Sequence, residues 1–152
     1  MRHDNGSRRA LGVERERRAA LKRILVVDDN EDVANCVAEV LRLMGHEARV
    51  AHNGRAALEM ASQAPTDVVL LDIVMPGMSG FEVARQIRLQ HGPAVLLIAI
   101  TAFGQAADRQ MSREAGFDLH LVKPVDMEQL KRLLESHGRA ETADTPRDPS
   151  AQ

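Results

Sequence analysis

Five polar residues follow directly on short apolar runs, and their types could do chemistry on phosphorus. They are Asp28, Asp29, Asp72, Thr101 and Lys123. Two like charges about 4 Å apart repel by about 4 kcal/mol at an effective dielectric of about 20, so three carboxylates held together require a cation. One lysine cannot neutralise three carboxylates. Oxygen ligands with few protein groups suit Mg²⁺, with Mn²⁺ as the alternative metal.

A carboxylate held beside a metal ion, an ammonium and a hydroxyl is equipped to attack phosphorus. In that arrangement Asp72 would be the nucleophile and would form an acyl phosphate. The metal and Lys123 would stabilise charge on the transferring oxygens. Turn formation or helix capping explains any one of these Asp residues just as well. The whole set at the ends of several apolar runs favours a site.

The elements that must bring these residues together alternate between strands and helices. The predicted strands are Arg23–Val27, Glu47–Ala51, Asp67–Leu71, Ala94–Ile100 and Asp118–Val122. The predicted helices are Glu31–Met44, Gly54–Gln63, Phe81–Leu89, Gln105–Ala115 and Asp126–Ser136. Five strand–helix pairs predict an α/β fold, a doubly wound five-stranded parallel sheet in a flavodoxin-like (βα)5 three-layer sandwich. Its ligand site lies outside the carboxyl ends of the strands.

Composition and charge exclude several classes of protein. The 152 residues include three Phe and no Tyr or Trp, which disfavours surfaces that stack nucleic-acid bases. Residues 1–22 hold seven Lys/Arg against three Asp/Glu, a net charge of +4, and the remainder carries −6. We therefore expect no direct DNA binding by the acidic part. No apolar run is long enough to span a membrane, and we expect a cytoplasmic location. The single cysteine, Cys36, is predicted to be a buried residue of the first helix.

Four segments resemble the receiver domain of two-component response regulators. They are Ile24–Asn30, Leu70–Gly80, Ile100–Ala102 and Leu121–Pro124, and the resemblance extends over about residues 22–136. The sequence is similar both to receivers that stand alone and to those attached to hybrid histidine kinases. The expected organisation is a basic, disordered leader over 1–21, a receiver domain over 22–137 and a disordered tail over 138–152.

The resemblance implies a role for each residue of the site. Asp72 would accept a phosphoryl group from a phosphohistidine of a sensor kinase or a histidine phosphotransfer domain. Asp29, Asp72 and the backbone carbonyl of Val74 would bind Mg²⁺, with Asp28 acting largely through water. Thr101 and Lys123 would bind the phosphoryl oxygens. The Lys123–Pro124 peptide bond is a candidate for the cis form, because it follows directly on a buried strand.

Three positions depart from the commonest pattern of the family. Where many members have Tyr or Phe as a rotameric switch that moves with the threonine, this sequence has His120. An imidazole can still swing, and unlike a phenyl ring it titrates near neutral pH; an exposed histidine at a strand edge is the alternative interpretation. Val74 and Phe103, two residues beyond Asp72 and Thr101, are apolar and cannot orient a hydrolytic water. They are therefore predicted to tune hydrolysis.

The sequence thus predicts a Mg²⁺-dependent phosphorylation switch that presents a changed surface to a downstream protein. It would catalyse only its own phosphorylation and dephosphorylation. A phosphorelay shuttle or a receiver fragment of a hybrid kinase is the alternative, and a homodimer that depends on phosphorylation stays open. A haloacid dehalogenase-type phosphatase would need a second Asp at Val74. A flavodoxin-like electron carrier would need a phosphate-binding loop at Asp28 and aromatic residues that this chain lacks.

Overall fold

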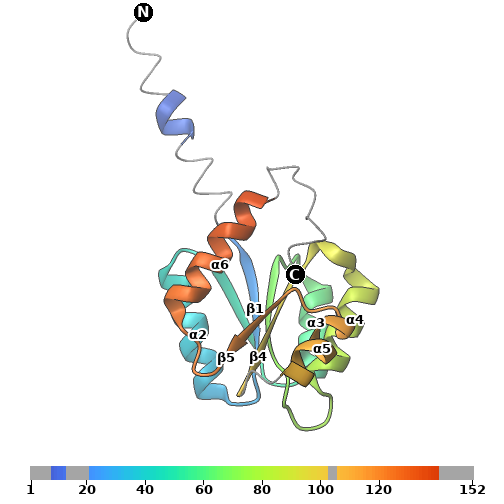
Figure 1. Ribbon diagram of the computed structural model, residues 1–152. Helices are drawn as coiled ribbons and strands as arrows, with labels where there is room; N and C mark the ends of the chain where they lie inside the picture. The colour runs from blue at the N-terminus through green and yellow to red at the C-terminus, as the bar shows by residue number, and fades with distance from the viewer. Residues whose placement is uncertain (1–7, 13–20, 103–105, 141–152) are drawn as a thin grey trace, which may run out of the picture. The chain divides into compact units, whose positions relative to one another are not determined.

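Five parallel strands form the sheet that positions the candidate site. The computed structural model describes residues 8–12, 21–102 and 106–140, and Lys22–Val125 form one compact unit (Figure 1). The strands are β1 (Arg23–Val27), β2 (Glu47–Ala51), β3 (Val68–Asp72), β4 (Leu96–Thr101) and β5 (Leu119–Val122). Their order is β2-β1-β3-β4-β5. The chain therefore changes its direction of winding between β1 and β3, which is where doubly wound sheets bind ligands.

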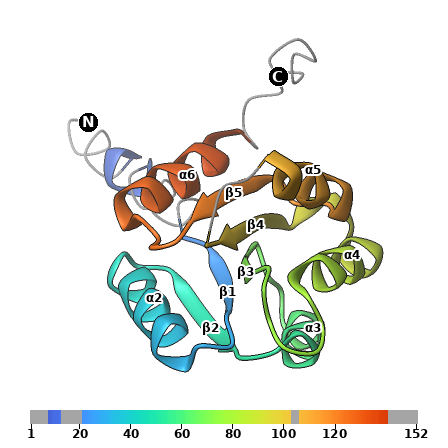
Figure 2. The same cartoon turned by 60° about the horizontal axis from the view of Figure 1, so that its bottom comes forward.

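Helices alternate with these strands, as predicted. They are α2 (Glu31–Leu43), α3 (Gly54–Gln63), α4 (Gly80–His91), α5 (Ala106–Ala115) and α6 (Met127–Ala140), with a short 3₁₀ turn, η1 (Gly92–Ala94), before β4. Figure 2 shows α2 on one face of the sheet and α3, α4 and α5 on the other. The fold is thus the predicted flavodoxin-like one.

Each of the helices α2, α3 and α4 begins at a polar cap. The side chain of Asn30 accepts a hydrogen bond from the Val33 N–H, and that of Asn53 accepts one from the Ala56 N–H. Ser79 caps α4 in the same way. These caps satisfy amide groups that the first helical turn leaves without partners. Helix α2 starts four residues after the end of β1, so its Asn30 cap also fixes the short loop that carries Asp28 and Asp29.

The core explains why the central strands read as unbroken apolar runs. Leu25, Val69, Leu71 and Leu97 are completely buried in one cluster with residues of α3 and α4. Alternate residues of β1 and β3 are equally buried on the opposite face. Strands covered on both faces have this character. Burial of apolar side chains on both faces of β1 and β3 stabilises the two strands that carry the acidic residues to the site.

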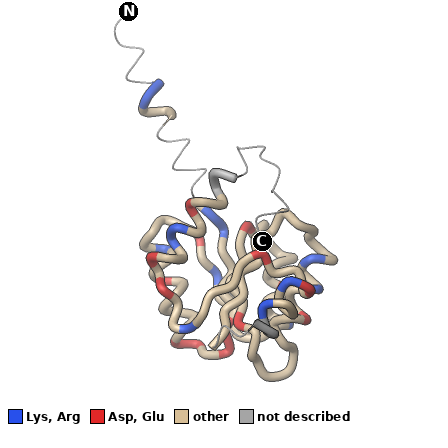
Figure 3. Tube along the Cα trace, in the orientation of Figure 1, with Lys and Arg blue, Asp and Glu red and all other residues tan. Residues whose placement is uncertain are grey.

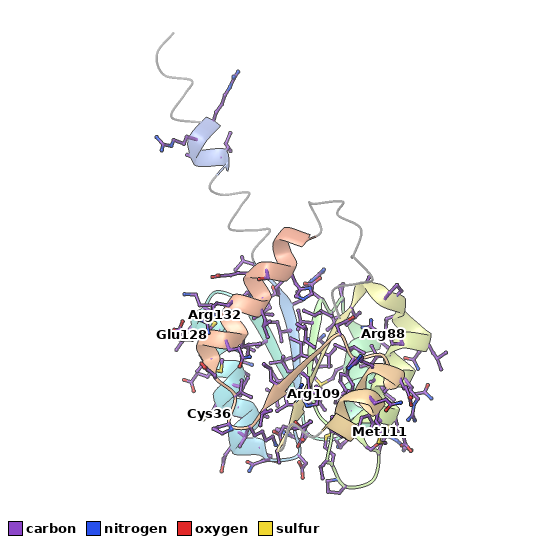
Figure 4. All side chains as sticks on the ribbon, viewed as in Figure 1. Cys36, Arg88, Arg109, Met111, Glu128 and Arg132 are labelled. Atoms are coloured by element: carbon purple, nitrogen blue, oxygen red, sulfur yellow. The ribbon has the colours of Figure 1, made fainter. Side chains whose placement is uncertain are left out.

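Arg88 of α4 ties together the ends of the strands opposite the site. Its guanidinium donates to the carbonyl oxygens of Gly116, Gly92 and Val95 at 2.9, 3.0 and 2.6 Å. It also forms an ion pair with Asp118. The side chain is labelled in Figure 4. One charged group thus satisfies three backbone carbonyls in the segments that lead into β4 and β5.

The structure differs from the sequence prediction in several element bounds and in the burial of one residue. Strand β3 includes Asp72, whose backbone pairs with Ile100, so that carboxylate belongs to the strand and does not follow it. The fourth strand starts at Leu96 because residues 92–94 form the 3₁₀ turn. The expected burial of Cys36 is wrong: the residue is exposed on α2 (Figure 4). The buried stripe of α2 is instead Ala34, Val37, Ala38 and Leu41, with helical spacing, and Cys36 lies beside it.

Helix α6 belongs to a second unit and is described by itself. It begins after Asp126, whose carboxylate accepts hydrogen bonds from the N–H groups of Glu128 and Gln129 at 3.0 and 3.3 Å. Among its residues up to His137, Leu130 and Leu134 are buried. The helix continues to Ala140, four residues beyond the predicted end. Among the described residues, no helix has the length and apolar character needed to cross a membrane.

Candidate functional site

Three carboxylates meet at the carboxyl ends of β1 and β3. Asp28, Asp29 and Asp72 each offer a carboxylate oxygen, and these atoms all lie within 4.8 Å of one another. Asp28 and Asp72 are buried, whereas Asp29 is exposed. Figure 3 shows acidic residues at this end of the sheet. The predicted convergence of these side chains is therefore confirmed.

Lys123 reaches the same cluster from the end of β5. Its Nζ lies 3.2 Å from Oδ2 of Asp72 and 3.3 Å from Oδ2 of Asp28. The backbone N–H of Lys123 donates to the carbonyl of Thr101 at 2.6 Å, which continues the pairing of β5 with β4. The Lys123–Pro124 peptide bond is cis, as predicted. One ammonium therefore faces the two buried carboxylates.

Burial and charge act against each other at this cluster. Burial raises the pKa of Asp72 above its ordinary value, and the nearby charge of Asp28 adds to the effect. The hydrogen bond and charge of Lys123 oppose the shift without cancelling it. For Lys123, burial favours the neutral amine, but the hydrogen bond to Asp72 and the two carboxylates raise the pKa. Two carboxylates that face one ammonium leave negative charge uncompensated, and a divalent cation would neutralise it.

Backbone amide groups hold the two buried carboxylates in place. Oδ1 of Asp28 accepts a hydrogen bond from the Asn30 N–H at 2.9 Å, and Oδ1 of Asp72 accepts one from the Val74 N–H at 3.3 Å. In each case the other oxygen, Oδ2, faces Lys123. The amide groups and the ammonium therefore orient both carboxylates without a bound ligand.

The start of α4 approaches the backbone of Asp72 so closely that only glycine fits there. A Cβ atom on Gly80 would lie 2.5 Å from the carbonyl oxygen of Asp72 and 2.7 Å from Cα of Ile73. The Gly80 N–H donates to the carbonyl of Ile73 at 2.9 Å. Gly80 thus closes the loop that carries Val74 back onto the strand that carries Asp72.

Thr101 is the last residue of β4, and His120 lies within the neighbouring strand β5. The hydroxyl oxygen of Thr101 is 2.9 Å from Nε2 of His120, a hydrogen-bond distance. Thr101 is buried and His120 is partly buried. The interpretation of His120 as an exposed strand-edge residue is therefore wrong, because its ring reaches the hydroxyl that ends the neighbouring strand.

The two positions predicted to tune hydrolysis have different outcomes. Val74 is 78% exposed at the mouth of the site. Phe103 lies outside the described residues. Met75 is buried in the cluster around β3, and Met60 and Met78 pack against that cluster.

Sequence analysis missed His52, which follows directly on β2. Its Nδ1 lies 3.3 Å from the carbonyl oxygen of Asp28. The Asp28 N–H in turn donates to the carbonyl of Ala51 at 3.1 Å. The signal was available, because His52 is a polar residue at the end of a predicted strand, the criterion that identified the other site residues.

The residues of this cluster fit a divalent cation. Asp28, Asp29 and Asp72 supply oxygen atoms, the donor type that Mg²⁺ prefers, and the exposed Asp29 leaves room for water ligands. Two buried carboxylates facing one ammonium also leave negative charge to be compensated. Together, the fold and the site define a flavodoxin-like α/β domain with an acidic, lysine-containing site at its ligand-binding edge.

Comparisons with known proteins agree with this class. The model of the response regulator receiver domain matches residues 24–135. Protein PilH of Pseudomonas aeruginosa is 35% identical over 117 residues, which cover 76% of this chain and 97% of PilH. The structure of the response regulator TrrA from Thermotoga maritima in complex with Mg²⁺–BeF has a TM-score of 0.68 at 36% identity, and the match covers 76% of this chain and 98% of that one. The chain therefore belongs to the response regulator receiver domain family.

Other relatives are longer than this chain. Sensory transduction protein RegX3 of Mycobacterium tuberculosis is 38% identical over 107 residues, which make up 70% of this chain but only 46% of RegX3. The chain thus spans about half of some relatives and nearly all of others. The family of this chain is the receiver domain of two-component signalling, which is a phosphoacceptor and not a conventional enzyme.

Proposed function

We propose that Asp72 is the phosphoacceptor of this receiver domain and that Mg²⁺ bound by Asp28, Asp29 and Asp72 is its cofactor. The observation that carries the proposal is the position of Lys123, whose Nζ lies 3.2 Å from Oδ2 of Asp72. Transfer of a phosphoryl group to a carboxylate needs positive charge beside the phosphoryl oxygens, and Lys123 together with a metal ion supplies it.

The other site residues have supporting roles in this proposal. The backbone carbonyl of Val74 completes the metal ligands, and Thr101 and Lys123 bind the phosphoryl oxygens. Thr101 and His120 transmit the conformational change caused by phosphorylation of Asp72 to the protein surface. The TrrA structure is a complex with Mg²⁺–BeF, and this supports the choice of metal.

The proposed donor is a phosphohistidine on a sensor kinase or on a histidine phosphotransfer domain. Asp72 is buried while Asp29 and Val74 at the rim are exposed, so the donor imidazole must enter from that rim. The readout is then a changed surface for a downstream protein target. A phosphorelay shuttle uses the same chemistry, because the phosphoryl group passes from Asp72 to a second histidine and regenerates the carboxylate, instead of the acyl phosphate being read by a target.

The domain organisation also stays a proposal. The matched residues 24–135 lie inside the predicted receiver range of 22–137. The flanking ranges, 1–21 as a basic leader and 138–152 as a tail, fall largely outside the described residues.

Phosphorylation by a small-molecule donor tests the proposal. Acetyl phosphate with Mg²⁺ should modify the wild-type protein and leave Asp72→Asn unmodified, as followed by intact mass. The adduct should be removed by hydroxylamine, because an acyl phosphate is attacked at its carbonyl carbon. Asp67→Asn is the matched control, since Asp67 pairs with Arg23 at the other end of the strand. A hydroxylamine-resistant adduct, or an equal yield in Asp72→Asn, would remove Asp72 from this role.

A further inference from the structure

The hydrogen bond between Thr101 and His120 joins the site to the edge strand β5. Its two atoms, Oγ1 and Nε2, are 2.9 Å apart. In the sheet, His120 lies beside Ala99, two residues before Thr101 on β4. Residues i and i+2 of a strand point to the same face, so Ala99, Thr101 and His120 share one face of the sheet. This register brings the imidazole to the hydroxyl.

The direction of this hydrogen bond depends on where the protons are. A threonine hydroxyl has a single proton to donate and can also accept. A ring nitrogen of histidine donates when it carries a proton and accepts when it does not. Without a ligand, either group can therefore be the donor.

A phosphoryl group on Asp72 removes this freedom. Phosphoryl oxygens are strong hydrogen-bond acceptors. The second pKa of the group is about 6, so above neutral pH the oxygens carry almost no proton to donate. If Thr101 binds a phosphoryl oxygen, its only proton is directed there, and its oxygen can then only accept from His120. Nε2 of His120 must therefore carry a proton in the phosphorylated protein.

We propose that His120 is a positioning residue that donates from Nε2 to Oγ1 of Thr101 and thereby aims the threonine proton at the phosphoryl oxygen. This inference rests on the proposed function and deepens it. The result is a chain of two hydrogen bonds, from imidazole to hydroxyl to phosphoryl oxygen, in which each bond strengthens the other. A phenylalanine at the same place could fill the space but could not donate.

Two variants separate donation from packing. His120→Phe keeps a ring of similar size and removes the donor, and it should weaken binding of beryllofluoride with Mg²⁺ by about tenfold. His120→Gln keeps an amide that donates, and its affinity should stay within about threefold of wild type. His137→Phe, a substitution of a histidine on α6, is the matched control and should bind like wild type.

Nitrogen NMR of ¹⁵N-histidine-labelled protein reads the proton directly. The His120 signals are identified by their loss in His120→Gln. In the complex with beryllofluoride and Mg²⁺ we expect Nε2 of His120 to show the shift of a protonated nitrogen. An unprotonated Nε2 in that complex, or His120→Phe binding as tightly as wild type, would overturn the inference.

The same measurements separate this inference from the proposed function. If beryllofluoride binds wild type and fails to bind Asp72→Glu or Asp72→Asn, the proposed function stands and the state of Nε2 decides the role of His120. If wild type does not bind beryllofluoride, the proposed function falls and the role of His120 falls with it.

Discussion

Lys123 places its ammonium 3.2 Å from the carboxylate of Asp72, although 51 residues separate the two in the chain. The parallel sheet creates this pair, because the strands that carry the two residues end at the same edge with only β4 between them. The ammonium thereby opposes the effect of burial on Asp72 and supplies one of the positive charges that a phosphoryl group would need.

Removing the ammonium should raise the pKa of Asp72 further. Burial already raises this pKa, and the hydrogen bond and charge of Lys123 oppose that shift. We therefore expect Lys123→Met to show a higher Asp72 pKa than wild type in the absence of metal. Titration of the ¹³C-labelled carboxyl carbons by NMR measures it, and Lys131→Met on α6 is the control. A pKa that falls or stays the same in Lys123→Met would contradict the electrostatic account of the site.

Adding a single methyl group at Gly80 should slow phosphorylation of Asp72 strongly and lower the unfolding free energy only moderately. The new Cβ would meet the backbone of Asp72 at 2.5 Å, and backbone cannot give way as a flexible side chain does. We expect Gly80→Ala to lose about 1–3 kcal/mol of unfolding free energy and to slow phosphorylation by acetyl phosphate at least about tenfold.

Gly54→Ala is the comparison for this effect. Its Cβ would meet side-chain atoms of Val83 and Met78, at 2.7 and 3.0 Å, between α3 and α4. It should lower the unfolding free energy in urea titrations by a similar amount and leave the phosphorylation rate within about threefold of wild type. Equal rates in the two variants would show that the close approach of Gly80 does not position Asp72.

Stability should fall in weak acid because of His46. Its Nδ1 accepts a hydrogen bond from the Lys22 N–H at 3.0 Å, and burial, with the charge of Lys22, lowers its pKa below the ordinary 6.5. A histidine with a lowered pKa in the folded state contributes stability above the pKa of the unfolded state. That contribution is lost as the pH falls through the folded pKa, when protonation removes the acceptor.

His46→Asn tests this contribution, since the amide oxygen accepts in a similar place and does not titrate. Urea unfolding at about pH 7.5 and about pH 5.0 should show wild type losing up to about 1 kcal/mol more than the variant, the usual net value of one hydrogen bond. Other titrating groups, such as the Asp67–Arg23 pair, are common to both proteins and cancel. An identical pH dependence in the two proteins would exclude His46 as the cause.

Much of the fold and of the site follows from the sequence, because both depend on local patterns. Apolar runs predict β1 and β2 to the residue, and the polar residues after several strands predict the meeting of Asp28, Asp72 and Lys123. Contacts that depend on packing geometry cannot be predicted from these local patterns. The approach of Gly80 to the backbone of Asp72 and the exposure of Cys36 arise from how α4 and α2 lie on the sheet. Periodicity alone does not fix the rotation of a short amphipathic helix to within one residue.

The lifetime of the phosphorylated protein should depend on Val74. Hydrolysis of an acyl phosphate needs a water in line with phosphorus, and a group that orients the water or accepts its proton speeds the reaction. Val74 is 78% exposed beside Asp72, and its apolar side chain offers neither. We expect Val74→Asn to shorten the lifetime of the phosphorylated protein by about threefold to tenfold, because a positioned amide supplies part of the about 10²-fold effect of a full acid–base group. Phe103→Glu is expected to act in the same direction.

Decay of radiolabelled phosphoprotein after removal of the donor measures this lifetime. Leu89→Asn is the matched control, because Leu89 is an equally exposed apolar residue, at 80%, near the opposite end of α4. It should decay like wild type. Mg²⁺ affinity should be nearly unchanged in Val74→Asn, since a metal ligand at this position is the backbone carbonyl, which the substitution keeps. If Val74→Asn decays no faster than Leu89→Asn while both bind Mg²⁺ like wild type, access of water to phosphorus is controlled by residues other than Val74.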